Sequence, residues 1–362
     1  MRVLVLYTQL AGYFYDCLLA LLAETDVKEI LVFASAPVSL APFEFEPNEN
    51  LVIQNLDDLD PFEIAQMSIK FSPDLVYIAG WSSRSNLKLC RYFKHKGVPI
   101  ILGLDNQWNG SFRQWIGKFV SPWLIRRSTT HVWVPGIYQY EFARHLGFKR
   151  REILFNLYSA NVSSFGKDVK LNLVKKEKEY PHVLLFAGRL VPEKGIRELL
   201  RAFSKLKSAT GNDWELWIIG NGPIAQEDSF SKAGVRHLNF VQPKDLPSLF
   251  AKCGAFCLPS YFENWGVVIH EAAAAGLPIL ASDACGATTA FVKHGYNGYI
   301  FHSGNQRSLE NQLANLLGEP DQVLVQMASR SSEMAKQISP TIWAATLSSL
   351  LENPDLVRKS LP

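Results

Sequence analysis

The sequence predicts two α/β domains in tandem, each a doubly wound parallel β-sheet covered by helices on both faces. Three observations support this fold class. The chain has 362 residues, roughly the length of two domains. Short and nearly continuous apolar segments alternate with helix-like segments, as expected for parallel strands buried on both faces. The alternation stops near residue 161 and begins again near residue 183.

In the first half, a strand over residues 3–7 is followed by a turn at Ala11 and Gly12 and by a helix over 13–23. Two more helix-like stretches, 86–96 and 137–146, separate further apolar strands. These strands are expected at 30–34, 75–79, 100–103 and 131–134. This order predicts an N-terminal Rossmann-like domain over residues 1–162.

Residues 161–180 interrupt the pattern. They contain Ser163, Ser164, Gly166 and the charge run 175–179, which predict a solvated linker region with room for a short local element. The alternation then resumes with strands at 183–187, 215–220, 255–258 and 279–281 and a helix over 196–209. We expect a second Rossmann-like domain over residues 163–337. In the remaining segment, 338–362, apolar residues recur at helical spacing, and this helix is expected to pack back toward the first domain.

The composition indicates a globular protein of a reducing compartment. Hydrophobic residues make up 48% of the chain and charged residues 20%, an ordinary globular balance. The number of cysteines is odd and no zinc-site spacing occurs, so we expect buried, reduced thiols at Cys17, Cys90, Cys253, Cys257 and Cys285. No apolar run has the length of a secretory signal or a membrane span, which favours a cytoplasmic location.

The most informative stretch is 259–282, PSYFENWGVVIHEAAAAGLPILAS. It predicts a strand end, a loop and a helix that begins near Val267. The first N–H groups of a helix have no partners within the helix and carry the positive end of its dipole, so they suit a diphosphate. Glu263 precedes this helix and Glu271 lies about one turn inside it, so both carboxylates flank the helix start. The loop before it also contains Asn264, Trp265 and Gly266.

Two glutamates separated by seven residues, Glu263 and Glu271, resemble the E-x7-E signature of retaining nucleotide-sugar glycosyltransferases with the GT-B fold, the group 1 type or glycosyltransferase family 4. Upstream segments resemble two further motifs of that family. The basic pair for the donor diphosphate corresponds to Gly188-Arg189-Leu190 and Lys194-Gly195. The loop near the nucleotide base corresponds to Gly220-Asn221-Gly222-Pro223. The motifs occur in the family's order within one domain.

The resemblance implies two domains facing across a cleft, with the acceptor in the first and the donor in the second. Arg189 and Lys194 are expected to neutralise the diphosphate and stabilise the charge that grows as the glycosidic bond breaks. Glu271 is expected to accept hydrogen bonds from the ribose, and Glu263 to contact the transferred sugar. The backbone of Asn264, Trp265, Gly266 and Val267 is expected to assist Glu263.

The implied reaction moves a hexose-type sugar, with retained configuration, from an NDP-sugar co-substrate to a glycan or lipid-linked acceptor. No metal and no other cofactor is expected. Surface polysaccharide or glycolipid biosynthesis is the implied setting. The alternatives are a non-catalytic NDP-sugar-binding protein, and an NDP-sugar epimerase or a phosphorylase of the same architecture. A nicotinamide dehydrogenase is disfavoured, because no G-x-G-x-x-G follows the first strand.

Each candidate residue also has a structural interpretation. Arg189 and Lys194 can be solvated surface charges, Trp265 can belong to the core, and Gly220 and Gly222 can be ordinary turn residues. These interpretations do not exclude the functional ones, because a glycine that forms a turn also lets a ligand approach the backbone.

The first half departs from the family pattern. Ala11-Gly12 stands where the family often has two glycines, and Gly12 remains a donor-binding candidate. Asp105 stands where the family often has a histidine, and a carboxylate accepts hydrogen bonds but cannot donate them. We expect Asp105 to contact the acceptor or the sugar, with a helix cap as the alternative. Asp58 and Asp60 form a D-x-D that predicts a helix-initiating turn rather than a metal-nucleotide site.

Charge is unevenly distributed along this half. Residues 1–80 contain 3 Lys/Arg and 12 Asp/Glu, net −9, whereas residues 81–151 contain 13 and 2, net +11. Apolar residues recur at three- and four-residue spacing from Trp108 to Leu124, with basic residues among them. This segment predicts either a face bound to an anionic membrane surface, on the inner side of the membrane, or a stripe facing the core. No nucleic-acid recognition motif accompanies it, so no nucleic-acid partner is expected.

Overall fold

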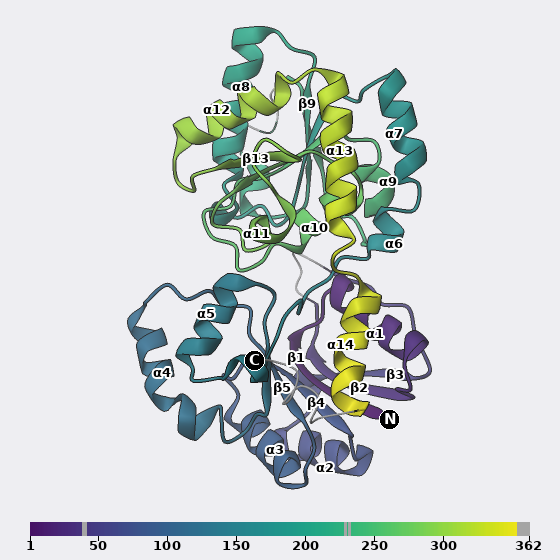
Figure 1. The fold of residues 1–362 in the computed structure, drawn as a ribbon, viewed down its shortest axis with the longest axis vertical. Helices are drawn as coiled ribbons and strands as arrows, with labels where there is room; N and C mark the ends of the chain where they lie inside the picture. The colour runs from purple at the N-terminus through teal and green to yellow at the C-terminus, as the bar shows by residue number, and fades with distance from the viewer. Residues whose placement is uncertain (38–41, 228–229, 231–232, 353–362) are drawn as a thin grey trace. The chain divides into compact units, whose positions relative to one another are not determined.

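The computed structural model describes residues 1–37, 42–227, 230 and 233–352, and divides the chain into two compact units (Figure 1). Unit 1 contains residues 1–37 and 45–159 together with the C-terminal helix α14 (Pro340–Glu352). Unit 2 contains residues 42–44 and 160–339. The last ten residues of the predicted C-terminal segment, 353–362, lie outside the described residues.

In the described part of unit 1, seven parallel strands form one sheet with the order β3-β2-β1-β4-β5-β6-β7. The strands are β1 (Arg2–Gln9), β2 (Glu29–Ser35), β3 (Leu51–Asn55), β4 (Leu75–Ala79), β5 (Ile100–Gly103), β6 (His131–Trp133) and β7 (Ile153–Leu154). In register, Val3 of β1 pairs with Ile30 on one side and Leu75 on the other. These central strands are apolar because both faces of the sheet are covered.

Two helical layers cover this sheet. On one face, α1 (Gly12–Glu24) packs beside α14, the yellow helix of Figure 1. There Trp343 of α14 stacks on Trp133 at 4.8 Å, and its indole Nε1 donates to the carbonyl of Leu157 at 2.8 Å. The other face and its edge carry the remaining helices: α2 (Pro61–Phe71), α3 (Arg84–His95), α4 (Phe112–Leu124) and α5 (Ile137–His145). The C-terminal helix is therefore part of the core of unit 1.

In the described part of unit 2, six parallel strands follow the order β10-β9-β8-β11-β12-β13. They are β8 (Val183–Ala187), β9 (Glu215–Ile219), β10 (Val235–Leu238), β11 (Ala255–Leu258), β12 (Ile279–Ser282) and β13 (Gly298–Phe301). The helices are α6 (Val162–Phe165), α7 (Val169–Lys178), α8 (Ile196–Thr210), α9 (Leu246–Phe250), α10 (Val267–Ala274), α11 (Thr288–Phe291), α12 (Gln306–Leu317) and α13 (Asp321–Ala335). Two short 3-10 helices, η3 (Pro192–Lys194) and η4 (Pro223–Gln226), follow β8 and β9.

Both sheets have a topological switch point, where the direction of strand addition reverses. It lies between β1 and β4 in unit 1 and between β8 and β11 in unit 2. In doubly wound sheets, ligands bind outside the carboxyl ends of the strands at this point. The loops that follow β8 and β11 are therefore the expected ligand-binding elements of unit 2.

The predicted doubly wound parallel sheets are confirmed in both units, but the solvated linker predicted over 161–180 is wrong. This stretch forms α6 and α7, and the side chain of Lys176 in α7 is buried. Its ammonium donates to the carbonyl of Gly276 at 3.4 Å, and Val169 packs where a Cβ on Gly276 would lie. Glycine at position 276 thus makes room for a helix whose charged sequence resembles a linker.

The helix-initiating turn predicted at the D-x-D is confirmed. The Asp60 carboxylate accepts from the backbone N–H groups of Phe62 at 2.7 Å and Glu63 at 2.8 Å, and Glu63 accepts in return from the N–H of Asp60. This is a capping box at the start of α2. All five cysteines are buried and form no disulfide. None of the described helices is long and apolar enough to cross a bilayer.

Candidate functional site

The loops that follow β8 and β11 meet at the switch point of unit 2. Gly195, at the end of the first loop, has φ of 66°, and a Cβ there would lie 2.1 Å from the carbonyl oxygen of Pro259 in the second loop. The N–H of Tyr261 also donates to the carbonyl of Glu193 at 2.8 Å. Only a glycine permits this approach, since any side chain would separate the two backbones.

An ion pair joins the same two loops. The Lys194 ammonium, at the end of η3, donates to the Glu263 carboxylate in the loop after β11. The two side chains are only 15% and 17% exposed. The predicted diphosphate-binding cation and the predicted sugar-binding carboxylate are therefore brought together. A diphosphate that enters here competes with the carboxylate for the ammonium, because both offer charged oxygen acceptors.

Arg189 lies in the loop immediately after β8 and is exposed. Among the described residues, none forms an ion pair with its guanidinium. The predicted basic pair is thus placed on one loop, with one cation held by Glu263 and the other accessible to an incoming anion.

The predicted nucleotide-base loop packs against the β8 loop through backbone contacts. A Cβ on Gly220, where φ is 135°, would lie 2.0 Å from the carbonyl oxygen of Gly188. The N–H of Leu190 donates to the carbonyl of Asn221 at 2.8 Å, and the Asn221 side chain accepts from the N–H of Phe240 at 3.2 Å. Gly222 lies immediately before η4, at its N-cap position. These glycines have a structural role, which is compatible with the predicted approach of a ligand.

Helix α10 begins at Val267, as predicted, after Gly266 with φ of 88°. Trp265 is only 3% exposed, and its ring packs in the core against Phe291 at 6.3 Å. Its side chain is therefore directed away from solvent, and the predicted donor contact at this position requires its backbone. Asn264 and Glu271 remain partly exposed on either side of the helix start.

Sequence reasoning missed His270, which lies between the two glutamates. Its Nδ1 accepts from the N–H of Ala160 at 3.0 Å, its Nε2 donates to the carbonyl of Ala335 at 2.9 Å, and its ring stacks on Phe291 at 4.1 Å. Burial lowers the pKa of His270 to about 4, against the opposing effect of two backbone carbonyls, so the imidazole is neutral. It ties α10 to the segments where the chain enters and leaves unit 2. A lone histidine in an apolar helix gave no signal of this role.

In unit 1, Asp105 follows β5 and lies among buried tyrosines. The Tyr158 hydroxyl donates to its Oδ2 at 3.2 Å. Burial raises the pKa of Tyr7 and Tyr77 well above the usual range, and the Asp105 charge raises both further. Asp105 caps none of the described helices; the following helix, α4, begins after Ser111. Gly12, the remaining candidate, begins α1 in the same unit.

The basic aromatic segment forms α4, and its apolar residues do not share one environment. Trp108 packs inward, stacking on His145 at 4.1 Å and lying 5.5 Å from Phe142. Most of the large apolar side chains of α4 are instead exposed to solvent. These are Phe112, Trp115, Ile116, Phe119, Val120 and Trp123. The interpretation of the segment as a core-facing stripe is therefore wrong for these six residues.

Comparison with known proteins finds similarity to the same family for the second half of the chain. Residues 170–337 match the family model of the group 1 glycosyl transferases. An uncharacterized glycosyltransferase of Methanocaldococcus jannaschii is 35% identical over 133 residues, 35% of this chain and 33% of that protein. The D-inositol 3-phosphate glycosyltransferase of Corynebacterium glutamicum is 30% identical over 179 residues, 46% of this chain and 42% of the relative. The matches thus span less than half the length of these relatives.

Solved structures show the same fold over nearly the whole chain. HepE of Anabaena, in complex with UDP and glucose, has a TM-score of 0.70 at 17% identity and covers 96% of this chain and 99% of its own. Sucrose-phosphate synthase of Thermosynechococcus elongatus has a TM-score of 0.74 at 14% identity, over 98% and 99%. The chain therefore has the GT-B class of fold, built from two Rossmann-like units. The predicted resemblance is confirmed over residues 170–337, which match the group 1 glycosyl transferase family model.

Proposed function

We propose that this protein moves a hexose-type sugar from an NDP-sugar to a glycan or lipid-linked acceptor, with retention of configuration and without a metal or other cofactor. The observation that carries the proposal is the meeting of Lys194 and Glu263. They come from the loops after the two central strands of a group 1 domain, next to the start of α10. A cation and a carboxylate at this point match the phosphate and sugar ends of one donor.

In this proposal, the diphosphate lies over the first N–H groups of α10 and between Arg189 and Lys194. The exposed guanidinium offers a planar pair of donors, and the ammonium offers a mobile point charge. When the phosphate takes over the ammonium, the Glu263 carboxylate is released to accept hydrogen bonds from the sugar hydroxyls. Glu271 accepts from the ribose, and the nucleotide base lies near the Gly220-Asn221-Gly222 loop.

The two cations then act most strongly during bond breaking. Negative charge grows on the leaving diphosphate as the glycosidic bond lengthens, so preplaced positive charge stabilises the transition state more than the ground state. The leaving phosphate oxygen takes the proton from the acceptor hydroxyl, which attacks on the same face. No side chain of the protein is then required as the base, and the anomeric configuration is retained.

The acceptor side is assigned to unit 1, with Asp105 as a hydroxyl acceptor. A carboxylate at the carboxyl edge of a sheet, held by a tyrosine hydroxyl, suits a polyol because it accepts hydrogen bonds without donating them. Lipid-linked acceptors find support in a Campylobacter jejuni relative, 28% identical over 219 residues, whose name describes transfer of N-acetylgalactosamine to a diphospho-undecaprenol-linked sugar. The proposal therefore includes a cytoplasmic enzyme at the inner membrane face, in surface polysaccharide or glycolipid synthesis.

The test is turnover of a panel of NDP-sugars with polyol and lipid-linked acceptors in the presence of EDTA, with the product anomer determined by NMR. Glu263→Gln should abolish transfer while the nucleotide diphosphate still binds. Lys205→Ala is a matched control, because Lys205 forms an ion pair with Glu310 on the surface of the same unit. Donor binding without turnover by any acceptor indicates a non-catalytic binding protein, and a changed free NDP-sugar indicates an epimerase. Either outcome refutes the proposal.

A further inference from the structure

Helix α4 exposes a continuous apolar surface, here called the α4 face: Phe112, Trp115, Ile116, Phe119, Val120 and Trp123. Phe112 is 80% exposed, and Phe119 and Trp123 are each 67% exposed. The spacing of three and four residues places them on one side of a helix about 18 Å long. Large aromatic side chains rarely stay in water together unless another surface covers them.

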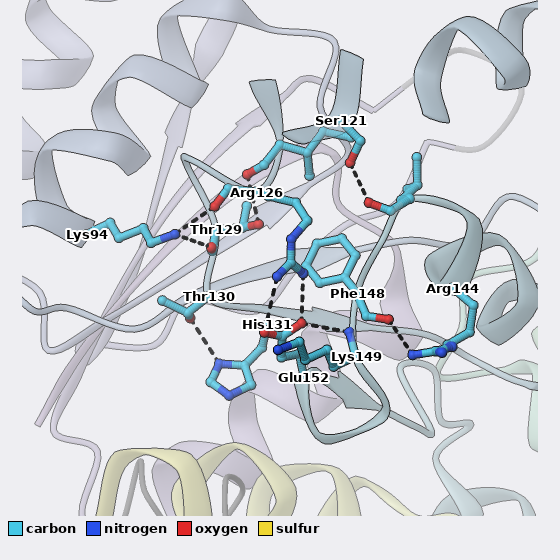
Figure 2. Close-up of polar contacts among 12 residues, drawn as sticks. Lys94, Ser121, Arg126, Thr129, Thr130, His131, Arg144, Phe148, Lys149 and Glu152 are labelled. Carbon is cyan, nitrogen blue, oxygen red and sulfur yellow. Dashed lines mark hydrogen bonds and ion pairs between the residues drawn. The ribbon is translucent and has the colours of Figure 1, made fainter. Parts of the chain in front are cut away.

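On the opposite side of α4, small residues pack against the rest of unit 1. The only buried residues of the helix are Gly117 and Ser121. A Cβ on Gly117 would lie 2.7 Å from the Trp81 ring, so the backbone lies close to the domain there. The Ser121 hydroxyl donates to the carbonyl of Leu146 at 2.7 Å (Figure 2). An ordinary surface helix turns its large apolar residues inward, and α4 has the reverse arrangement.

The segment that follows α4 is anchored by charged groups, as Figure 2 shows. The Arg126 guanidinium binds the Glu152 carboxylate through two hydrogen bonds of 2.7 and 3.2 Å. The Lys94 ammonium donates to the carbonyls of Arg126 and Thr129, both at 2.7 Å. The chain immediately after α4 is therefore held to Lys94 of α3 and to Glu152 by several hydrogen bonds.

Positive charge surrounds the α4 face. Arg113 and Lys118 lie within the helix, with the Lys118 ammonium 4.7 Å above the Trp115 ring, and Arg127 is exposed just beyond its end. No acidic residue occurs in residues 106–140. A second copy docked on the same face would bring like charges together, which disfavours self-association. An aromatic centre with basic side chains around it instead complements the headgroups and outer acyl region of an anionic bilayer.

We propose that the α4 face inserts into the interfacial layer of an anionic phospholipid membrane, with Arg113, Lys118 and Arg127 on the headgroups. This inference rests on the proposed function only for its purpose, which is to bring unit 1 to a lipid-linked acceptor. The binding itself depends on no donor, acceptor or turnover, so it can fail or succeed independently of the enzymatic proposal.

The experiment is flotation of the full chain with vesicles of phosphatidylcholine alone or of phosphatidylcholine with phosphatidylglycerol. We expect binding to the anionic vesicles, weakened by salt. The Phe119→Ser/Trp123→Ser variant should lose binding by about tenfold or more, since two large side chains leave the apolar layer. Arg113→Ser should lose about fivefold, corresponding to one basic residue near an anionic surface. Circular dichroism should show both variants folded.

Phe62→Ser is the matched control, because Phe62 of α2 is also 67% exposed but lies outside the α4 face. It should bind vesicles like the wild type. Equal loss in the control, unchanged binding in the Phe119/Trp123 variant, or no wild-type binding to anionic vesicles would overturn the inference. A dimer that the same double variant dissociates would overturn it as well, because a second copy would then be the occupant. Hydrolysis of NDP-sugars in vesicle-free buffer should remain the same in all variants.

Discussion

The buried imidazole of His270 makes the stability of unit 2 depend on pH in a direction that the structure fixes. In the folded state, burial lowers the pKa of His270 to about 4, whereas a histidine in the unfolded chain has a pKa of about 6.5. The unfolded state therefore binds the proton first on acidification. The stabilisation from the neutral imidazole is complete above about pH 6.5 and is lost progressively as the pH falls toward about 4.

The magnitude follows from the two pKa values. At about pH 5, the linkage amounts to about 2 kcal/mol of lost stability from this group alone. In His270→Leu, the titration and both hydrogen bonds are absent, at a cost of about 2–4 kcal/mol near neutral pH. The difference in unfolding free energy between wild type and variant should therefore shrink by about 2 kcal/mol between about pH 7.5 and about pH 5.

Urea unfolding at the two pH values measures this difference. His182→Gln is the control of opposite sign. Burial alone would lower the pKa of His182. The carboxylates of Asp321 and Asp213 outweigh burial and raise this pKa above its usual value. Its contribution is therefore complete in acid and is lost as the pH rises through the raised pKa. A His270→Leu penalty that stays constant with pH would refute the neutral, buried imidazole and its role in holding α10.

Three further substitutions have expected outcomes. Glu271→Ala should weaken nucleotide-diphosphate binding by about tenfold or more in calorimetry, because a charged acceptor for the ribose is lost, and unchanged affinity would refute that role. Gly195→Ala should lower the stability of the protein to urea far more than Gly211→Ala. The two glycines have φ of 66° and 63°, but only Gly195 lies against a backbone, that of Pro259, so equal effects would contradict the close approach. Trp343→Ala should cost about 3–5 kcal/mol of unfolding free energy, and a cost below 1 kcal/mol, as is typical of surface positions, would contradict the packing of α14 in the core.

The central strands of both sheets were predictable from sequence, and the edge strands were not. The four strands that the sequence pattern missed, β3, β7, β10 and β13, are the outer strands of the two sheets. An edge strand is covered on fewer sides, so it needs no continuous apolar run: β10 has the sequence VRHL, and two residues of β3 are exposed. Helix α7 was missed because its packing depends on the space left by Gly276, which is distant in the sequence.

The candidate donor site was predictable in so far as it consists of short motifs. Residues separated by a few positions, such as Glu263 and Glu271, carry a signal in the sequence itself. The Lys194–Glu263 pair joins residues 69 positions apart, and the contacts of His270 with Ala160 and Ala335 span 110 and 65. Contacts of this kind depend on strand order, which apolar patterns do not contain. The exposure of the α4 face could not be predicted either. The spacing of apolar residues shows that they share one side of a helix, but not whether that side faces the core or the solvent.

The most direct test of the account is a thermal-shift panel of UDP, GDP, ADP, dTDP and CMP on wild type, Lys194→Ala and the control Lys205→Ala. A ligand at about 100 times its dissociation constant adds about 2.7 kcal/mol of stability, which corresponds to about 5–10 °C for a unit of this size. One nucleoside diphosphate is expected to raise the Tm of wild type and control by this amount, with little effect on Lys194→Ala. No shift with any nucleotide, or the same shift in all three proteins, would contradict the assignment of the loops after β8 and β11 as a nucleotide-sugar site.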